Sequence, residues 1–279
     1  MVILADEYGF CFGVERALEI AGDALGKHGS IEIAGEIIHN GRVREELAKK
    51  GLSHRDSAGG IMGKKALVRA HGMGRKTREL LVSRGVALID ATCPVVQRVY
   101  DEALECEEKG IAPVIFGNPG HPEIAGVIDH LKNRPVVISP EDDFKKTRLP
   151  ERFVLIAQTT APEERFIELA EHCGRSGMDF TVVNTICPVV RKRKEAGSRL
   201  AETCGLIIVA GARASANTKG LADYLSRFRP TIQVESAEEI RGMDFGRSEK
   251  IGLISGTSTP GEVVEEIFDD IEKKIVYKT

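Results

Sequence analysis

The chain has 279 residues, of which 42% are hydrophobic and 29% charged, a composition that is ordinary for a globular protein. Its 39 basic and 42 acidic residues give a formal net charge of −3, so no basic excess points to a nucleic-acid partner. The N-terminus lacks a basic segment followed by an apolar run, and no apolar run approaches the ~20 residues that span a bilayer. We therefore expect a cytoplasmic protein without a membrane partner, whose six cysteines bind metal, do chemistry or fill a core.

Short apolar strands alternate with amphipathic helices along the chain. The predicted strands are 2–5, 31–34, 66–70, 87–90, 113–116, 136–138, 153–157, 181–183, 206–210, 231–234 and 251–254. The predicted helices are 14–25, 76–84, 95–109, 122–132, 162–173, 189–203, 217–228 and 261–273. Several strands are continuous apolar runs, which are typical of parallel strands covered on both faces. The pattern predicts an α/β fold with mostly parallel sheets.

A faint internal repeat divides the chain. Cys-Pro-Val-Val occurs at 93–96 and again at 187–190, each time after a strand and a threonine. Cys11 lies at a similar place, in a glycine-rich loop that opens a helix. The spacing of these three cysteines fits three similar α/β units.

Polar residues recur where the predicted strands end, which is where open α/β sheets bind ligands. Proline directly follows Cys93, Cys187, His121 and Thr259, and each proline opens a predicted helix. Proline favours the first helical position, so the preceding residue is expected at the cap. A helix start carries partial positive charge, which lowers the pKa of a thiol and attracts anions. The pattern therefore indicates thiolates beside a phosphate-like ligand.

Structural readings compete with these functional ones. Three cysteines lie beside apolar residues in helices and are expected to be structural: Cys106, Cys173 and Cys204. The basic run 191–194 is expected to be a solvated helix face. The other three cysteines form no Cys-x-x-Cys pair, and three thiolates fit either an iron–sulfur cluster with one iron unligated by protein or a zinc with an open position.

An ordered series of motifs resembles a known family. The motifs are Gly-Phe-Cys-Phe-Gly-Val (9–14), Ile-His-Asn (38–40), Ala-His-Gly (70–72), Asp-Ala-Thr-Cys-Pro (90–94), Gly-His-Pro-Glu (120–123), Gln-Thr-Thr (158–160), Thr-Ile-Cys (185–187), Ser-x-Asn-Thr (215–218) and a Ser-Thr-Pro turn at Ser258. Together they resemble the 4-hydroxy-3-methylbut-2-enyl diphosphate reductases, which complete the methylerythritol phosphate route to isoprenoids. Each motif is weak alone, but the ordered set spans nearly the whole chain.

The resemblance implies a fold and a chemistry. It implies three α/β units in a trefoil around a central cavity, and a 4Fe-4S cluster held by Cys11, Cys93 and Cys187. It also implies that the remaining iron binds the substrate hydroxyl, which two electrons and protons remove as water. Glu123 matches the proton source and Thr159 the threonine that relays to the hydroxyl. The residues that match the diphosphate-binding positions are His39, His71, His121, Ser215, Asn217 and Ser258.

The expected domains are an N-terminal segment 1–13, which contributes Cys11 and packs with the third unit, and three α/β units at 14–96, 97–191 and 192–279. The chain departs from the family pattern in two places. Pro188-Val189-Val190 replaces polar residues expected after the third cysteine, and Ala216 replaces a second serine. Substrate identity therefore stays open.

The alternatives are a reductase of a different phosphorylated allylic alcohol, a non-catalytic iron–sulfur redox sensor, and a zinc-stabilised structural protein. The sequence carries no flavin or nicotinamide fingerprint after a strand, so an external electron donor such as ferredoxin or flavodoxin is expected.

Overall fold

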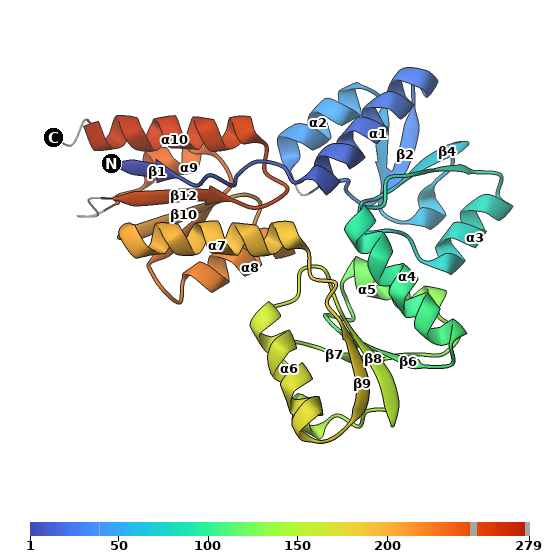
Figure 1. Ribbon diagram of the computed structural model, residues 1–279. Coiled ribbons are helices and arrows are strands. Elements are labelled where there is room, and N and C mark those ends of the chain that lie inside the picture. Colours follow the sequence, from blue (N-terminus) through green and yellow to red (C-terminus); the bar gives the residue numbers. More distant parts are fainter. Residues whose placement is uncertain (39, 246–249, 277–279) are drawn as a thin grey trace. The chain divides into compact units, whose positions relative to one another are not determined.

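A computed structural model describes residues 1–38, 40–245 and 250–276, in which strands and helices alternate (Figure 1). The strands are β1 (Val2–Leu4), β2 (Ile31–Ala34), β3 (Leu52–Arg55), β4 (Lys65–Val68), β5 (Ala87–Asp90), β6 (Ala112–Phe116), β7 (Val136–Ile138), β8 (Arg152–Ala157), β9 (Asp179–Val183), β10 (Leu206–Ala210), β11 (Thr231–Val234) and β12 (Ile251–Ser255). The helices are α1 (Phe12–His28), α2 (Gly41–Lys49), α3 (Arg75–Ser83), α4 (Pro94–Glu108), α5 (Pro122–His130), α6 (Glu163–Arg175), α7 (Pro188–Thr203), α8 (Ala216–Leu225), α9 (Ala237–Gly242) and α10 (Gly261–Val276). No helix among these residues is long and apolar enough to cross a membrane.

The described strands form three four-stranded sheets, with the orders β1-β12-β10-β11, β3-β2-β4-β5 and β7-β6-β8-β9. Every pairing between neighbouring strands is parallel. The first strand of the chain pairs with the last, with Val2 opposite Ile251. The prediction of an α/β fold with three similar, mostly parallel units is confirmed, whereas the predicted domain boundaries stay a prediction.

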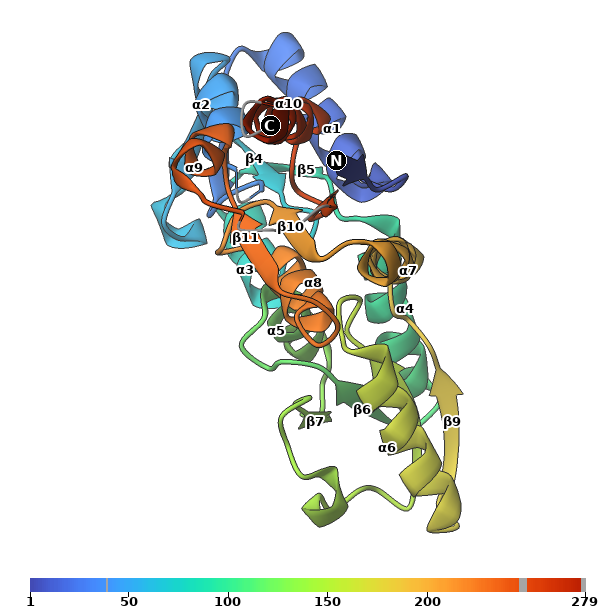
Figure 2. The same ribbon diagram turned by 90° about the vertical axis from the view of Figure 1, so that its left-hand side faces the viewer.

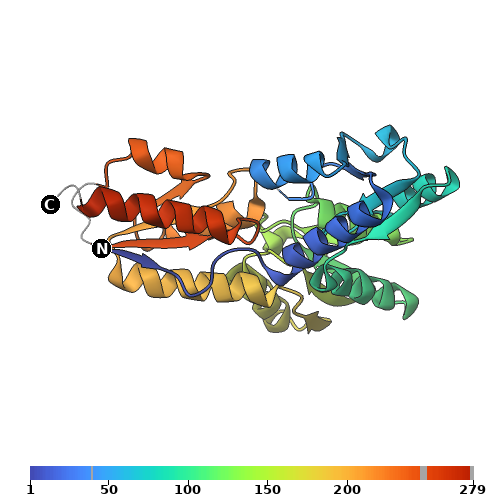
Figure 3. The ribbon, with the colours of Figure 1, turned by 90° about the horizontal axis from the view of Figure 1, so that it is seen from above.

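The chain folds into two compact units, and the first holds Met1–Glu15, Ile38–Glu45 and Pro188–Thr279. Its sheet β1-β12-β10-β11 is covered on both faces. Helices α9 and α10 pack on the face that carries Ile208 and Leu253, and α7 and α8 pack on the opposite face. Figure 3 shows α10 in red and α7 in yellow-orange on opposite sides of this sheet. Burial on both faces explains why these strands are continuous apolar runs.

The second unit holds Arg16–Ile37 and Glu46–Cys187, and therefore two of the sheets. In β7-β6-β8-β9, helices α4 and α5 cover the face that carries Ile115 and Ile156. Helix α6 covers the other face, where Phe116 and Phe166 lie in the same hydrophobic core (Figure 2). The carboxyl ends of β6 and β8 lead into the loops that carry several of the predicted site residues.

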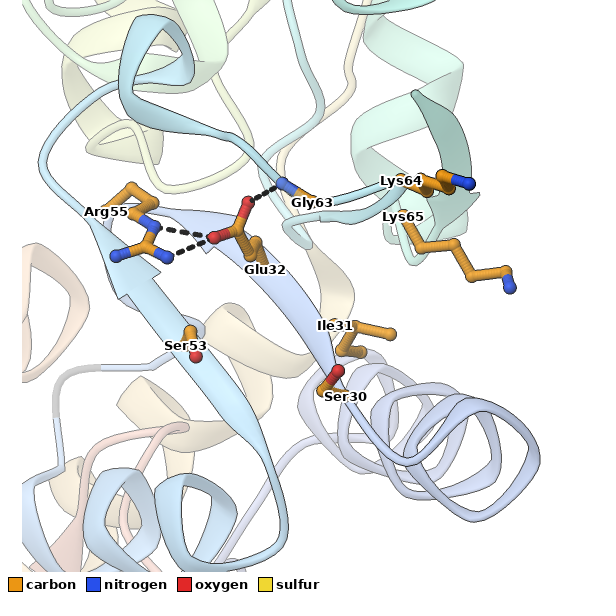
Figure 4. Close-up of a pocket in the computed structure, with 8 residues that line it drawn as sticks. All are labelled: Ser30, Ile31, Glu32, Ser53, Arg55, Gly63, Lys64 and Lys65. Carbon is orange, nitrogen blue, oxygen red and sulfur yellow. Dashed lines mark hydrogen bonds and ion pairs between the residues drawn. The ribbon is translucent and has the colours of Figure 1, made fainter. Parts of the chain in front are cut away.

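A buried glutamate fastens the loop before β4 onto the sheet β3-β2-β4-β5. Glu32 accepts hydrogen bonds from Arg55 Nε at 2.7 Å and from the backbone N–H groups of Met62 at 2.7 Å and Gly63 at 2.6 Å. Arg55 Nη2 donates to the same carboxylate. Glu32, Arg55 and Gly63 line a surface pocket of about 360 Å³, which Ser30, Ile31, Ser53, Lys64 and Lys65 complete (Figure 4). Every oxygen of this carboxylate is therefore saturated by donors within the protein.

Most predicted elements are confirmed to within a few residues, and the exceptions are polar. Strand β3 was missed because its sequence, Leu-Ser-His-Arg, neither alternates nor forms an apolar run. Helices α2 and α9 were missed because they are short and begin without a proline signal. The predicted proline starts are confirmed for α4, α5 and α7, whereas α10 begins at Gly261, one residue after Pro260.

Candidate functional site

Glu123 is a buried carboxyl group at the start of α5. Pro122 opens the helix, and His121 caps it by accepting a hydrogen bond from Glu123 N at 3.3 Å through Nδ1. The side chain of Glu123 is 1% exposed and accepts hydrogen bonds from Thr159 N at 2.8 Å and Thr159 Oγ1 at 2.6 Å. Burial raises the pKa of Glu123 from 4.5 to about 7, although both bonds from Thr159 oppose the rise. A carboxyl with this pKa holds a proton that it can release near neutral pH.

Two of the predicted histidines lie next to each other in the same unit. His71 follows β4, and its ring meets the ring of His121 edge to face, with 5.4 Å between the centroids. Tyr100 Oη donates to the backbone oxygen of His71 at 3.4 Å, which ties helix α4 to this loop. The structure therefore brings His71 and His121 together beside the cap of the helix that carries Glu123.

Cys93 and Cys187 each lie between a strand and a helix that begins with proline, as predicted. The backbone N–H of Cys93 donates to Ala70 O at 3.0 Å, directly before His71. The backbone N–H of Cys187 donates to Thr159 O at 2.8 Å, so this cysteine is tied to the residue that holds Glu123. Neither cysteine forms a disulfide, and both are partly exposed.

Four predicted residues gather around the loop that follows β12 in the other unit. Cys11 N donates to Thr257 O at 3.1 Å, and Asn217 Nδ2 donates to Thr257 Oγ1 at 2.7 Å. Ser258 Oγ donates to Ser215 Oγ at 3.4 Å, while Ser215 caps α8. The loop before α1, which carries Cys11, is thus bonded to the loop after β12, which carries Ser258 and also contacts Asn217.

His39, the remaining predicted ligand, lies outside the residues that the structure describes. Within the described part of the chain, no three His, Cys, Asp or Glu side chains are grouped so as to hold a metal ion. The three strand-end cysteines differ clearly from the other three, because Cys106, Cys173 and Cys204 are buried. The structural role predicted for those three is confirmed by their place in the hydrophobic cores.

The basic run 191–194 is not a solvated face, because Arg193 is 3% exposed. Arg193 shares the buried stripe of α7 with Ala196, Gly197 and Leu200. The stripe follows the spacing i, i+3, i+4 and i+7, which is typical of the inward face of a helix. That spacing was the signal in the sequence that distinguishes Arg193 from its exposed neighbours.

A second arginine was overlooked at the end of β4. Arg69 is half-buried, and its guanidinium makes no hydrogen bond or ion pair with any residue in the described ranges. It lines a pocket of about 600 Å³ together with Leu67, Met73 and the first turn of α3. The pocket therefore places the Arg69 guanidinium close to the loop that carries His71, and Asp56, Lys76 and Asp129 also line it.

Comparison with known proteins places the chain in one family. Residues 2–272 match the family described as LytB protein. The 4-hydroxy-3-methylbut-2-enyl diphosphate reductase of Dictyoglomus thermophilum is 34% identical over 269 residues, which cover 96% of this chain and 95% of that protein. The enzyme of the same name from Geobacter metallireducens is 32% identical over 98% of this chain and 97% of its own length.

Solved structures agree with the sequence relatives. A structure titled as (E)-4-hydroxy-3-methyl-but-2-enyl diphosphate reductase, the terminal enzyme of the non-mevalonate pathway, has a TM-score of 0.72 and 30% identity, with 98% and 99% of the two chains covered. The Plasmodium falciparum E-1-hydroxy-2-methyl-but-2-enyl-4-diphosphate reductase shares the fold with a TM-score of 0.88, at 23% identity over 96% of this chain and 87% of that one. The resemblance drawn from the motifs is thereby confirmed: the chain belongs to the LytB protein family and is an oxidoreductase of that family.

Proposed function

We propose that this protein reduces 4-hydroxy-3-methylbut-2-enyl diphosphate to isopentenyl and dimethylallyl diphosphate. The reaction breaks the C–O bond of the allylic alcohol, consumes two electrons and two protons, and releases the hydroxyl as water. The observation that carries the proposal is the buried pair of Glu123 and Thr159, because the reaction needs a proton donor and the pKa of Glu123 is raised to about 7.

Glu123 is proposed to hold the proton, and Thr159 to pass it on. Thr159 Oγ1 lies 2.6 Å from the carboxyl group, close enough for a proton to move between the two. Thr159 N holds the other carboxyl oxygen at 2.8 Å, which fixes the orientation of the acid. Because Glu123 and Thr159 are buried, bulk water does not reach the carboxyl group, and its proton is available to a bound ligand.

We propose that Cys11, Cys93 and Cys187 hold a 4Fe-4S cluster. The donor chemistry fits, because three partly exposed cysteines that form no disulfide lie at helix starts, which suits thiolate ligation and leaves one iron without a protein ligand. When bound, the cluster would supply electrons and a Lewis-acidic iron toward the hydroxyl. The backbone hydrogen bond between Cys187 and Thr159 would hold the proton-relay threonine next to one of the cluster ligands.

The diphosphate is proposed to bind to histidine, hydroxyl and amide groups at the starts of helices. His71 and His121 offer ring nitrogens beside α5, and Ser215 and Asn217 lie at the start of α8. Free N–H groups at helix starts favour phosphate oxygens, and protonated histidine adds charge. Ser258 and His39 complete the proposed set. These residues are assigned to the diphosphate because the proposed substrate carries one.

The electron donor is proposed to be an external small carrier of the ferredoxin or flavodoxin kind, and the location the cytoplasm. A second candidate substrate is a different phosphorylated allylic alcohol. It is favoured by the first turn of α7, where Pro188, Val189 and Val190 supply only apolar side chains directly after Cys187.

The test quantifies iron, sulfide and turnover on one anaerobically purified sample. We expect about four iron and four sulfide per chain, broad visible absorption, and reduction of the named diphosphate by a strong chemical reductant. Cys93→Ala should lose most of the iron, whereas Cys106→Ala, in the core of the same helix, should keep it. Protein that binds no iron after reconstitution would overturn the proposal, and zinc without labile sulfide would favour the structural alternative. Iron-loaded protein without turnover favours the other substrate or the redox sensor.

A further inference from the structure

Arg193 joins the segment before Cys11 to the end of β12. Its Nη2 donates to Gly9 O at 2.7 Å. Its Nη1 donates to Ser255 O at 2.8 Å and to Ser255 Oγ at 3.0 Å. Ser255 Oγ also accepts from Gly9 N at 3.0 Å, so the same two residues hold Gly9 at both its N–H and its carbonyl. The loop that delivers Cys11 is therefore fixed by one buried guanidinium and one hydroxyl.

Gly9 adopts a backbone conformation with φ of +79°, which suits glycine. The chain turns there so that its carbonyl faces Arg193, and Cys11 follows two residues later with its own N–H bonded to Thr257 O at 3.1 Å. The loop is thus anchored at two points, at Gly9 by Arg193 and Ser255, and at Cys11 itself by Thr257. A conformationally free glycine-rich loop would position a metal ligand poorly, and these hydrogen bonds restrict the conformation of the loop.

The charge of Arg193 is not neutralised by an ion pair. It forms no salt bridge with a carboxylate in the described part of the chain, and its Nε lies buried without a hydrogen-bond partner there. All of its bonds go to neutral carbonyl and hydroxyl oxygens. Burying an unpaired charge is costly, and an arginine cannot escape the cost by losing its proton. A protein that keeps such a charge needs a negative group within electrostatic reach.

Two groups act on this guanidinium electrostatically. Burial lowers the pKa of Arg193, and Glu7 and the Cys11 thiol oppose that change. Glu7 acts from a distance without a salt bridge, and Cys11 is the one of the two groups that is proposed to hold the cluster.

We infer that Arg193 is a positioning residue for Cys11 and that its buried charge raises the reduction potential of the group that Cys11 holds. The inference rests on the proposed function, because it takes Cys11 as a ligand of a cluster. A positive charge near a cluster stabilises the reduced form, which carries one more negative charge than the oxidised form. Arg193 therefore makes the protein easier to reduce by an external carrier.

The experiment separates the charge from the anchor with three variants of the intact, cluster-loaded protein. Arg193→Gln removes charge and anchor, Arg193→Lys keeps the charge but loses the forked geometry, and Ser255→Ala keeps the charge but loosens Gly9. The control is Arg199→Gln, which removes an exposed arginine from the same helix. The readouts are the midpoint potential from an EPR-monitored redox titration, the iron content, and the thermal midpoint of the apoprotein.

We expect a more negative midpoint potential in Arg193→Gln alone, and a lower apoprotein thermal midpoint in all three variants but not in the control. An unchanged potential in loaded Arg193→Gln overturns the inference. An equal shift in Arg193→Lys or Ser255→Ala also overturns it, because the effect would then be the anchor and not the charge. If Arg193→Gln does not fold, the other two variants still test the inference, since both must keep the wild-type potential. Wild-type protein without a cluster would instead refute the proposed function.

Discussion

Two buried glutamates in the same unit show how partners decide what a carboxyl group can do. Both side chains have little exposed surface, 7% for Glu32 and 1% for Glu123, but Glu32 borders a surface pocket whereas Glu123 lies deep in the unit. Burial disfavours the charge of Glu32, but hydrogen bonds from Gly63, Arg55 and Met62 outweigh it and lower its pKa. Among the described residues, the Glu123 carboxyl group accepts hydrogen bonds from Thr159 alone, and burial raises its pKa to about 7. One side chain is fixed as an anion, and the other keeps an exchangeable proton.

A second difference between the two carboxyl groups lies in the hydrogen-bond partners of each oxygen. Every partner of Glu32 is a donor, and one of them is a cation, so only an acceptor fits that position. Glu123 faces one backbone donor and one hydroxyl, and a hydroxyl either donates or accepts. An amide is therefore expected to fit at position 123 and to fail at position 32. The same substitution gives opposite results at the two sites.

The largest expected effect is the loss of turnover in Glu123→Gln. Its amide oxygen accepts from Thr159 N, and its NH₂ donates to Thr159 Oγ1, so folding is preserved while the proton is lost. We expect activity to fall about 10²- to 10⁴-fold, the usual contribution of a general acid. The measurement is steady-state turnover of the diphosphate with a chemical reductant, with the iron content checked in parallel. Turnover within a few fold of wild type would remove Glu123 from the reaction.

The pH dependence of turnover belongs to the same prediction. The acid works when protonated, so wild-type activity should decline as pH rises through about 7. Folding follows the same sign: the folded-state pKa is above 4.5, so the contribution of Glu123 to stability is full below 4.5 and is lost as pH rises through about 7. Glu123→Gln should show neither decline. A wild-type decline centred far from neutral pH would contradict this account.

Glu32→Gln is expected to cost stability and to leave the chemistry intact. The amide NH₂ has only donors to face, so at least one buried hydrogen bond is lost, at a cost of about 1–3 kcal/mol. Urea unfolding at neutral pH measures this cost, and turnover of the folded variant should stay close to wild type. The folded-state pKa of Glu32 is below 4.5, so its contribution is present above that pH and is lost as pH falls through the folded-state pKa. An undiminished free energy of unfolding at neutral pH would show that the loop is held by other contacts.

The two glutamates also show how far the sequence alone reaches. Gly-His-Pro-Glu placed Glu123 at a helix start after a strand, and the family resemblance implied its role as proton source. Local signals of the same kind placed Cys93 and Cys187. Glu32 carried no such signal, since its partners Arg55, Met62 and Gly63 are 20 or more residues away and meet it only after folding. Strand β3, which carries Arg55, was missed for the same reason, because its polar sequence becomes a strand only by pairing with β2.

Arg193 could be predicted in part from the sequence: its burial follows from local spacing, whereas its partners do not. A run of four basic residues indicates a solvated face, but only Arg191 and Lys192 are exposed, while Lys194 is partly buried and Arg193 is buried. Helical spacing places Arg193 among the buried residues of α7, but only the folded loops supply Gly9 and Ser255 as its partners. Periodicity therefore predicts which side chain is buried, and tertiary contacts decide whether a buried charge is tolerated.

A smaller effect is expected from Thr159→Val, which removes one of the two bonds that oppose the raised pKa of Glu123. The pKa should rise further, so the decline in activity should move to higher pH by up to about one unit, since one unit corresponds to about 1.4 kcal/mol. The rate on the acidic side should also fall, because the relay hydroxyl is gone, and Thr159→Ser should restore both. Thr160→Val is the matched control, because that hydroxyl bonds to Gln158 and not to Glu123. A shift of the decline to lower pH would mean that the hydroxyl does not stabilise the carboxylate.

The smallest effect is expected from Tyr100→Phe, which tests whether Thr159 alone balances Glu123. Burial raises the pKa of Tyr100, and the nearby Glu123 raises it further, so the phenol stays neutral throughout the working pH range. Its hydroxyl donates a long hydrogen bond of 3.4 Å to His71 O. We therefore expect a loss of about 0.5–1 kcal/mol in stability, a KM raised by no more than a few fold through the looser His71 loop, and a pH decline that does not move. Tyr224→Phe, which loses a bond to Ser198 in the other unit, controls for the removal of a tyrosine hydroxyl. If the pH at which activity declines moves in Tyr100→Phe, then Tyr100 as well as Thr159 sets the pKa of Glu123. The difference between Glu123 and Glu32 would then depend on several partners of Glu123 and not on Thr159 alone.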